Sequence, residues 1–168
     1  ILKKIKHRDN KKVGAIFTLV LGIISFIIIY GVEVLDWSND TWLLASERDL
    51  RAHYIGWKFF RKSSWNFPFG LMDNIVYPDK LSIIYTDSIP LLAIFFKLLN
   101  CILPSDFQYF GIWGCVCFML QGYFAYKILS HKIDNIWICV IGAEFFILSP
   151  TMIFRLFYHT ELAAHFLI

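Results

Sequence analysis

Three stretches of the chain consist almost entirely of apolar residues. Residues 13–32 hold twenty positions without a charge, which matches about 30 Å of hydrocarbon at about 1.5 Å per helical residue. Residues 107–129 begin with a second uncharged run of twenty, and residues 136–150 form a third run that only Glu144 interrupts. The pattern predicts three transmembrane helices over these ranges.

A fourth apolar stretch, residues 89–103, is shorter and carries Lys97 in its middle. A segment of this length with an internal charge favours a helix that lies along the membrane surface or enters it part-way. We therefore expect three spans, with four spans as the alternative. Because ionisable groups in apolar segments usually face protein, Lys97 and Glu144 are expected to mark interior faces.

The flanking charges predict an orientation. Basic residues concentrate in a tail at residues 1–12 and in the short link between the second and third spans, whereas acidic residues follow the first span. The positive-inside rule then places the N-terminus in the cytoplasm of a multi-pass cell-membrane protein. Residues 33–106 become a long extracytoplasmic loop, and residues 13–168 form one membrane domain.

Composition supports a membrane protein. Hydrophobic residues make up 58% of the chain and charged residues only 17%, which is far from the balance of a soluble enzyme domain. The net charge of +3 is modest, and the basic residues lie in small groups, so no nucleic acid is expected as a partner. The chain opens on Ile1 and stops at Ile168 inside an apolar run, and we expect it to be the front of a longer polypeptide.

The first half of the loop contains one clear helical pattern, predicted over residues 46–62. Its aromatic and aliphatic residues recur with the 3.6-residue period of a helix face. Ser46 and Asp49 have the spacing of a capping box at its start. The residues of the apolar face are Leu50, Tyr54, Trp57 and Phe60.

Two pairs of polar residues four positions apart could carry chemistry. Asp49 and His53 share a face of the loop helix, where a carboxylate shielded by aromatic rings could act as a general base or bind a metal; the alternative is a simple helix cap. Arg155 and His159 follow the third span, where the guanidinium could hold a lipid phosphate. The alternative for Arg155 is a side chain that merely reaches to the interface. Asp87 is either a helix N-cap or a ligand on the same side of the membrane.

Four short motifs follow one another along the chain: Asp49-x-x-x-His53-x-x-Gly56-Trp57, Trp65-x-Phe67-Pro68-x-Gly70, Tyr85-Thr-Asp-Ser-Ile-Pro-Leu91 and Phe107-Gln-Tyr-Phe-Gly111. They accompany one span, a long outer loop with an acidic residue in its first helix, surface helices and further spans. Together these features resemble the front of the GT-C membrane glycosyltransferases, within an uncharacterised bacterial branch. The resemblance spans about residues 13–168.

The resemblance implies an all-α integral membrane fold and transfer of a sugar from a polyprenyl-phosphate donor to an extracytoplasmic acceptor. It implies Asp49 as the catalytic carboxylate, with a divalent metal as a candidate cofactor. His53, four residues later, is the second expected catalytic residue because it could orient Asp49 or share its proton. Membrane lipid is expected to surround the protein and to contact it as a partner. The alternative is a non-enzymatic polytopic protein, either a transporter segment or an envelope-assembly subunit. The residues expected to bind substrate are Arg155, His159, Trp57 and Asp87.

Overall fold

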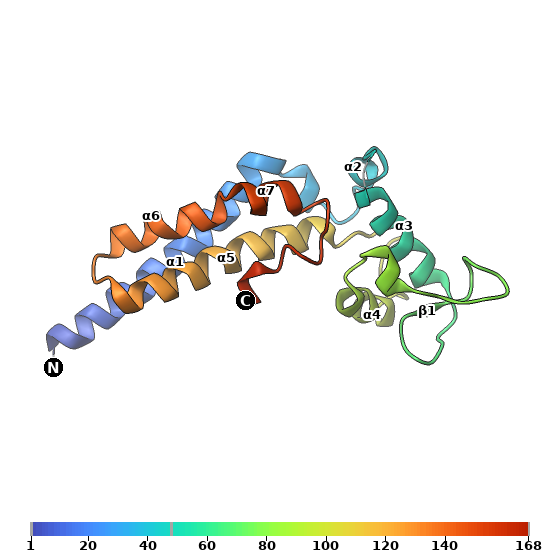
Figure 1. The fold of residues 1–168 in the computed structure, drawn as a ribbon, viewed down its shortest axis with the longest axis horizontal. Coiled ribbons are helices and arrows are strands. Elements are labelled where there is room, and N and C mark those ends of the chain that lie inside the picture. Colours follow the sequence, from blue (N-terminus) through green and yellow to red (C-terminus); the bar gives the residue numbers. More distant parts are fainter. Residues whose placement is uncertain (1, 48, 168) are drawn as a thin grey trace.

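The computed structural model describes residues 2–47 and 49–167, and it divides into a helical bundle and a head (Figure 1). The bundle consists of α1 (Leu2–Tyr30), α5 (Phe110–Lys132) and α6 (Ile136–Ile147), which lie side by side. Residues 33–106, here called the head, fold together at one end of the bundle. The chain therefore leaves the bundle once, builds the head and then returns.

Three helical segments of the described chain are long and apolar enough to cross a membrane: residues 10–30, 110–132 and 136–155. This confirms the three predicted spans and the assignment as a mainly helical membrane protein. The fourth apolar stretch forms α4 (Pro90–Leu98), which has nine residues and cannot cross about 30 Å of hydrocarbon. The four-span alternative is therefore wrong for the described residues.

The helix ends differ from the predicted ones for local reasons. Helix α1 continues back through the basic tail to Leu2. Helix α5 begins at Phe110 rather than at residue 107, because Phe107 and Tyr109 are buried in the core of the head. After α6, Pro150 starts a separate helix, α7 (Pro150–Arg155), whose N-terminus is capped by the Ser149 hydroxyl. Proline lacks the N–H that a continuous helix would need, so the break falls there.

Small residues let the helices of the bundle approach closely. A Cβ atom at Gly22 would lie 2.8 Å from the Phe118 carbonyl oxygen, so α1 and α5 nearly touch at this level. Four residues later the rings of Phe26 and Phe118 pack edge to face with centroids 5.6 Å apart. Glu144 of α6 faces α1, where the Ser25 hydroxyl lies 3.5 Å from its carboxylate. The expectation of an interior-facing Glu144 is confirmed.

Among its described residues the head contains three α-helices, a hairpin and a 3-10 turn before α4: α2 (Thr41–Leu44), α3 (Asp49–Lys62), the antiparallel strands β1 (Leu71–Met72) and β2 (Leu81–Ser82), η2 (Ile83–Thr86) and α4. The hairpin is a small exception to the all-α prediction. A further 3-10 turn, η1 (Glu33–Leu35), connects α1 to the head and contacts α5.

Helix α3 forms one wall of the core of the head. Its predicted apolar face is buried throughout, at Leu50, Tyr54, Trp57 and Phe60. The helix begins at Asp49, however, so Ser46 lies before it and the predicted start was three residues too early. The rings of Tyr109 and Phe110 stack with centroids 4.7 Å apart, which brings the start of α5 into the same core.

Lys97 of α4 is enclosed by the head, as its apolar surroundings predicted. Its ammonium nitrogen lies 4.1 Å and 4.6 Å from the ring centroids of Phe60 and Trp65. It also donates hydrogen bonds to the Ser63 hydroxyl (2.9 Å) and the Ser64 carbonyl (3.2 Å). This lysine therefore joins α4 to the end of α3.

Candidate functional site

The candidate site is built on a sharp turn between η2 and α4. Asp87 and Ile89 both have left-handed backbone conformations, with φ of 49° and 50°. Such values are uncommon for residues other than glycine, and for a β-branched residue such as isoleucine they indicate strain. Asp87 caps the end of η2, whereas Ile89 occupies the N-cap position of α4. The prediction that Asp87 is a helix N-cap is therefore wrong.

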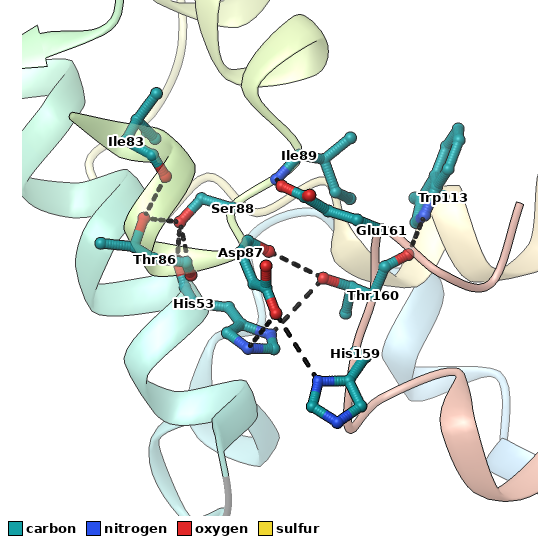
Figure 2. Close-up of polar contacts among 10 residues, drawn as sticks. All are labelled: His53, Ile83, Thr86, Asp87, Ser88, Ile89, Trp113, His159, Thr160 and Glu161. Carbon is teal, nitrogen blue, oxygen red and sulfur yellow. Dashed lines mark hydrogen bonds and ion pairs between the residues drawn. The ribbon is translucent and has the colours of Figure 1, made fainter.

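Side chains of the segment after α7, together with Tyr109 just before α5, hold this turn in place; Figure 2 shows Thr160 and Glu161 beside it. The Thr160 hydroxyl donates to the Asp87 carbonyl at 2.9 Å, and the Ile89 N–H donates to the Glu161 carboxylate at 3.2 Å. The Tyr109 hydroxyl donates to the carbonyl of Ser88. Three successive backbone groups are thus fixed by side chains from outside the head, which can maintain the strained conformation.

The side chain of Asp87 points between two histidines (Figure 2). Its Oδ2 atom lies 3.8 Å from Nε2 of His53 and 3.6 Å from Nδ1 of His159. The His53 side chain is only 4% exposed, whereas those of Asp87 and His159 are 40% and 47% exposed. The carboxylate therefore has one buried neighbour and one solvent-accessible neighbour.

Two further contacts fix His53. The Ser88 hydroxyl donates to the His53 carbonyl at 2.6 Å, and the Thr160 hydroxyl lies 3.4 Å from Nδ1 of its ring. These contacts attach α3 to the turn and to the segment after α7. The imidazole consequently has little freedom to rotate away from Asp87.

The electrostatics of the site favour a neutral His53. Burial lowers the pKa of His53, although the carboxylates of Asp87 and Asp49 oppose this shift. Burial also raises the pKa of Glu161, as does repulsion from Asp87. At neutral pH Asp87 therefore lies beside an uncharged imidazole at His53 rather than beside a fixed cation there.

The structure brings together three of the six residues predicted for the site: His53, Asp87 and His159. Asp49 is the exposed first residue of α3, one turn before His53. Arg155 is the exposed last residue of α7, and its carbonyl accepts a hydrogen bond from the His159 N–H at 2.9 Å. The second member of each predicted i, i+4 pair thus reaches Asp87.

Trp57 is placed elsewhere. Its side chain is fully buried in the core of the head, where the indole N–H donates to the Phe107 carbonyl at 3.0 Å. Its observed contacts are structural ones. Conversely, sequence reasoning missed the role of Thr160, because an isolated hydroxyl residue carries no spacing pattern. Ser88 and Tyr109 both lie inside motifs that the sequence analysis singled out, although no role was predicted for either.

No group of three or more His, Cys, Asp or Glu side chains suited to a metal ion occurs among the described residues. The described residues therefore do not fit the divalent metal that the resemblance implies.

A family described as a domain of unknown function, DUF6311, matches residues 19–168. The chain belongs to this family. The DUF6311 match covers the head, the second and third spans and every residue of the Asp87 site. No significant match was found among curated proteins or among solved structures.

Proposed function

We propose that this chain is the N-terminal part of a GT-C-type membrane glycosyltransferase that uses a sugar linked to polyprenyl phosphate. The observation that carries the proposal is the half-exposed carboxylate of Asp87 between the imidazoles of His53 and His159. A carboxylate in contact with two histidines is suited to accept a proton from an attacking group. The order of one span, a folded head and two further spans supports the proposal.

The proposed orientation places the head on the extracytoplasmic side of the cell membrane. At the bundle end opposite the head, the spans are flanked by six lysines and arginines among the first twelve residues and by Lys127 and Lys132 on the last turns of α5. By the positive-inside rule that end is cytoplasmic. The Asp87 site then lies at the outer surface, where a lipid-linked donor would present its sugar and phosphate.

In the proposed reaction Asp87 is the general base. An acceptor hydroxyl attacks C1 of the donor sugar and forms the new bond, while its proton passes to the Asp87 carboxylate. The bond between C1 and the carrier phosphate breaks, and its electron pair leaves with the phosphate. His159 is exposed and adjacent, so it can orient the acceptor or relay the proton to solvent.

The geometry favours Asp87 over Asp49 for this role. Both histidines contact Asp87, whereas Asp49 lies at the exposed start of α3 and acts on His53 only as a nearby charge. We assign Asp49 a modulating role through that charge. Arg155, exposed at the end of α7, remains the proposed contact for the carrier phosphate, because its planar group can bind two oxygens.

The test uses the protein at its full natural length, purified and incubated with polyprenyl-phosphate sugars and a mixed panel of acceptors. We expect sugar transfer, and Asp87→Asn should reduce its rate by about 100-fold or more, since loss of a general base typically costs this much. The shape of the side chain is retained, so insertion and folding should be unchanged.

Asp79→Asn is the matched control, because Asp79 is an exposed aspartate of the same head. It should leave transfer unchanged. Asp49→Asn should lower the rate less than Asp87→Asn. If Asp49→Asn abolishes transfer and Asp87→Asn does not, the assignment of the base is wrong. Absence of transfer from every donor, with a folded protein, would favour a transporter segment or an assembly subunit.

A further inference from the structure

A second candidate site lies at the end of the bundle opposite the head (Figure 1). Here α1 and α5 border a cavity of about 520 Å³. Its wall combines cationic and apolar side chains, and it is far from the turn that carries Asp87. The lining residues include Lys11, Lys12, Ile16, Tyr123, Lys127 and His131.

We propose that this cavity binds an anionic phospholipid, with the phosphate at the lysines and an acyl chain along the apolar wall. The proposal is independent of the proposed sugar transfer. The ligand is a membrane lipid rather than a soluble phosphate, because the lysines suit the phosphate of a lipid and the apolar wall suits its acyl chain. Basic pockets between transmembrane helices are suited to lipid headgroups.

The positive charge of the cavity comes from both helices. Lys12 of α1 and Lys127 of α5 are exposed, and both line the cavity. Lys11 is engaged differently, since its ammonium donates to the Ser130 carbonyl at 2.6 Å and lies 3.4 Å from the Asp134 carboxylate. Asp134 offsets Lys11, so the attraction for a phosphate depends mainly on Lys12 and Lys127.

The apolar part lies deeper along the same helices. Ile16 follows Lys12 by one helical turn and is 61% exposed. Tyr123 precedes Lys127 by one turn, and the Lys127 ammonium lies 5.9 Å from its ring centroid. Both residues therefore lie on the side of the lysines that faces the middle of the bundle. An acyl chain beside them would continue the membrane interior, whereas a soluble phosphate would leave this wall unused.

The test measures binding of single lipids to the full natural chain in detergent by native mass spectrometry. The probes are dioleoyl phosphatidylglycerol, which is anionic, and dioleoyl phosphatidylcholine, which is zwitterionic. We expect one phosphatidylglycerol to bind at least about fivefold more tightly than phosphatidylcholine. Lys127→Gln should remove about fivefold of that affinity, the contribution typical of one lysine near an anionic lipid surface.

Lys132→Gln is the matched control, because Lys132 is exposed on the same helix but does not line the cavity. It should change the affinity by less than about twofold. If Lys127→Gln and Lys132→Gln lose the same affinity for phosphatidylglycerol, the attraction is a diffuse effect of charge and the proposal is overturned. Equal binding of the two lipids would also overturn it.

A competition experiment separates a lipid site from a soluble phosphate site. Glycerol 1-phosphate carries the headgroup charge without acyl chains, and we expect it not to displace bound phosphatidylglycerol. Ile16→Ser should weaken lipid binding, because it removes exposed apolar wall without touching a lysine. Efficient displacement by glycerol 1-phosphate, together with unchanged binding in Ile16→Ser, would show that only the phosphate is recognised and would overturn the lipid assignment.

Discussion

The Nδ1 atom of His159 lies 3.6 Å from the Oδ2 atom of Asp87, although the second and third spans both lie between the two residues in sequence. Both side chains are close to half exposed, so water screens their attraction. This contact therefore contributes little to stability, and in the proposed function His159 acts on the chemistry at the carboxylate instead.

Replacement of His159 should affect activity far more than stability. His159→Gln should lower sugar transfer by about tenfold or more, because the exposed proton acceptor beside Asp87 is lost. Its unfolding free energy should change by less than about 0.5 kcal/mol, as expected for a screened pair. Transfer rates and thermal unfolding of the same preparation check both parts.

Thr160→Val is the matched comparison, because it removes the buried hydroxyl that bonds to the Asp87 carbonyl. It should cost about 1–3 kcal/mol in stability. If His159→Gln proves as destabilising as Thr160→Val, the His159 contact is structural.

His53 should make stability depend on pH. Burial lowers its pKa in the folded state below the ordinary value of 6.5, so the unfolded chain binds the proton more readily. Stability should be retained above about pH 6.5 and should fall as the pH decreases toward the lowered pKa of the folded state.

The measurement is the melting temperature of detergent-solubilised protein between about pH 5 and 7.5, for the natural protein and for His53→Gln. The melting temperature of His53→Gln should fall less at low pH than that of the natural protein. Glu161, whose pKa is raised by burial, contributes a slope of the opposite sign. Both proteins should therefore be compared again in a Glu161→Gln background, and identical slopes there would contradict the assignment to His53.

Periodicity predicted the architecture of this chain well, because spans and the α3 face depend on local composition. The apolar runs located the three spans, and the burial of Leu50, Tyr54, Trp57 and Phe60 follows from their helical spacing. Helix ends were less predictable. The start of α5 at Phe110 depends on Phe107 and Tyr109 packing into the distant core of the head, which no local pattern records.

The candidate site was predicted only in part for a similar reason. Its i, i+4 pairs identified His53 and His159, but their meeting at Asp87 depends on a left-handed turn. Neither Asp87 nor Ile89 is a glycine, so the sequence carried no signal for that conformation. The hydroxyl of Thr160 matters because of where the segment after α7 lies, which is a property of the folded chain.

Lys97 should be a strong determinant of the stability of the head. Lys97→Ala removes two hydrogen bonds and two cation–π contacts from a buried position, and should cost about 2–4 kcal/mol. Hydrogen exchange of the α3 and α4 backbone checks this prediction. Lys62→Ala, at an exposed position at the end of α3, should be near neutral. Equal protection in the two variants would contradict the buried role.

Gly111 should be essential for joining the head to the bundle. A Cβ atom at this position would lie 1.7 Å from the Val34 carbonyl oxygen, which is a severe clash with backbone. Gly111→Ala should cost about 3 kcal/mol or more, since η1 or α5 must shift. At Gly142 the nearest atom is the tip of the Leu129 side chain, at 2.6 Å, which can move. Gly142→Ala should therefore be tolerated. The measurement is the yield of folded protein from Gly111→Ala and from Gly142→Ala.

The proposed orientation can be checked by labelling with a membrane-impermeant thiol reagent. Cys101 is exposed and must first be replaced by serine, whereas the other three cysteines are buried. Trp37→Cys and Asp79→Cys should then react in intact cells, because both positions are exposed in the head. Cysteines at Asn10 and Ser130 should react only after lysis. External reaction at Ser130 would reverse the orientation.

The turn that carries Asp87 has a consequence for biogenesis. Its three backbone anchors come from Tyr109, Thr160 and Glu161, so two of them are synthesised only after the third span. A nascent chain that has not yet reached Thr160 and Glu161 lacks two of the contacts that hold Asp87 and Ile89 in their left-handed conformations. We therefore expect this turn to reach its final conformation only after the third span has been synthesised.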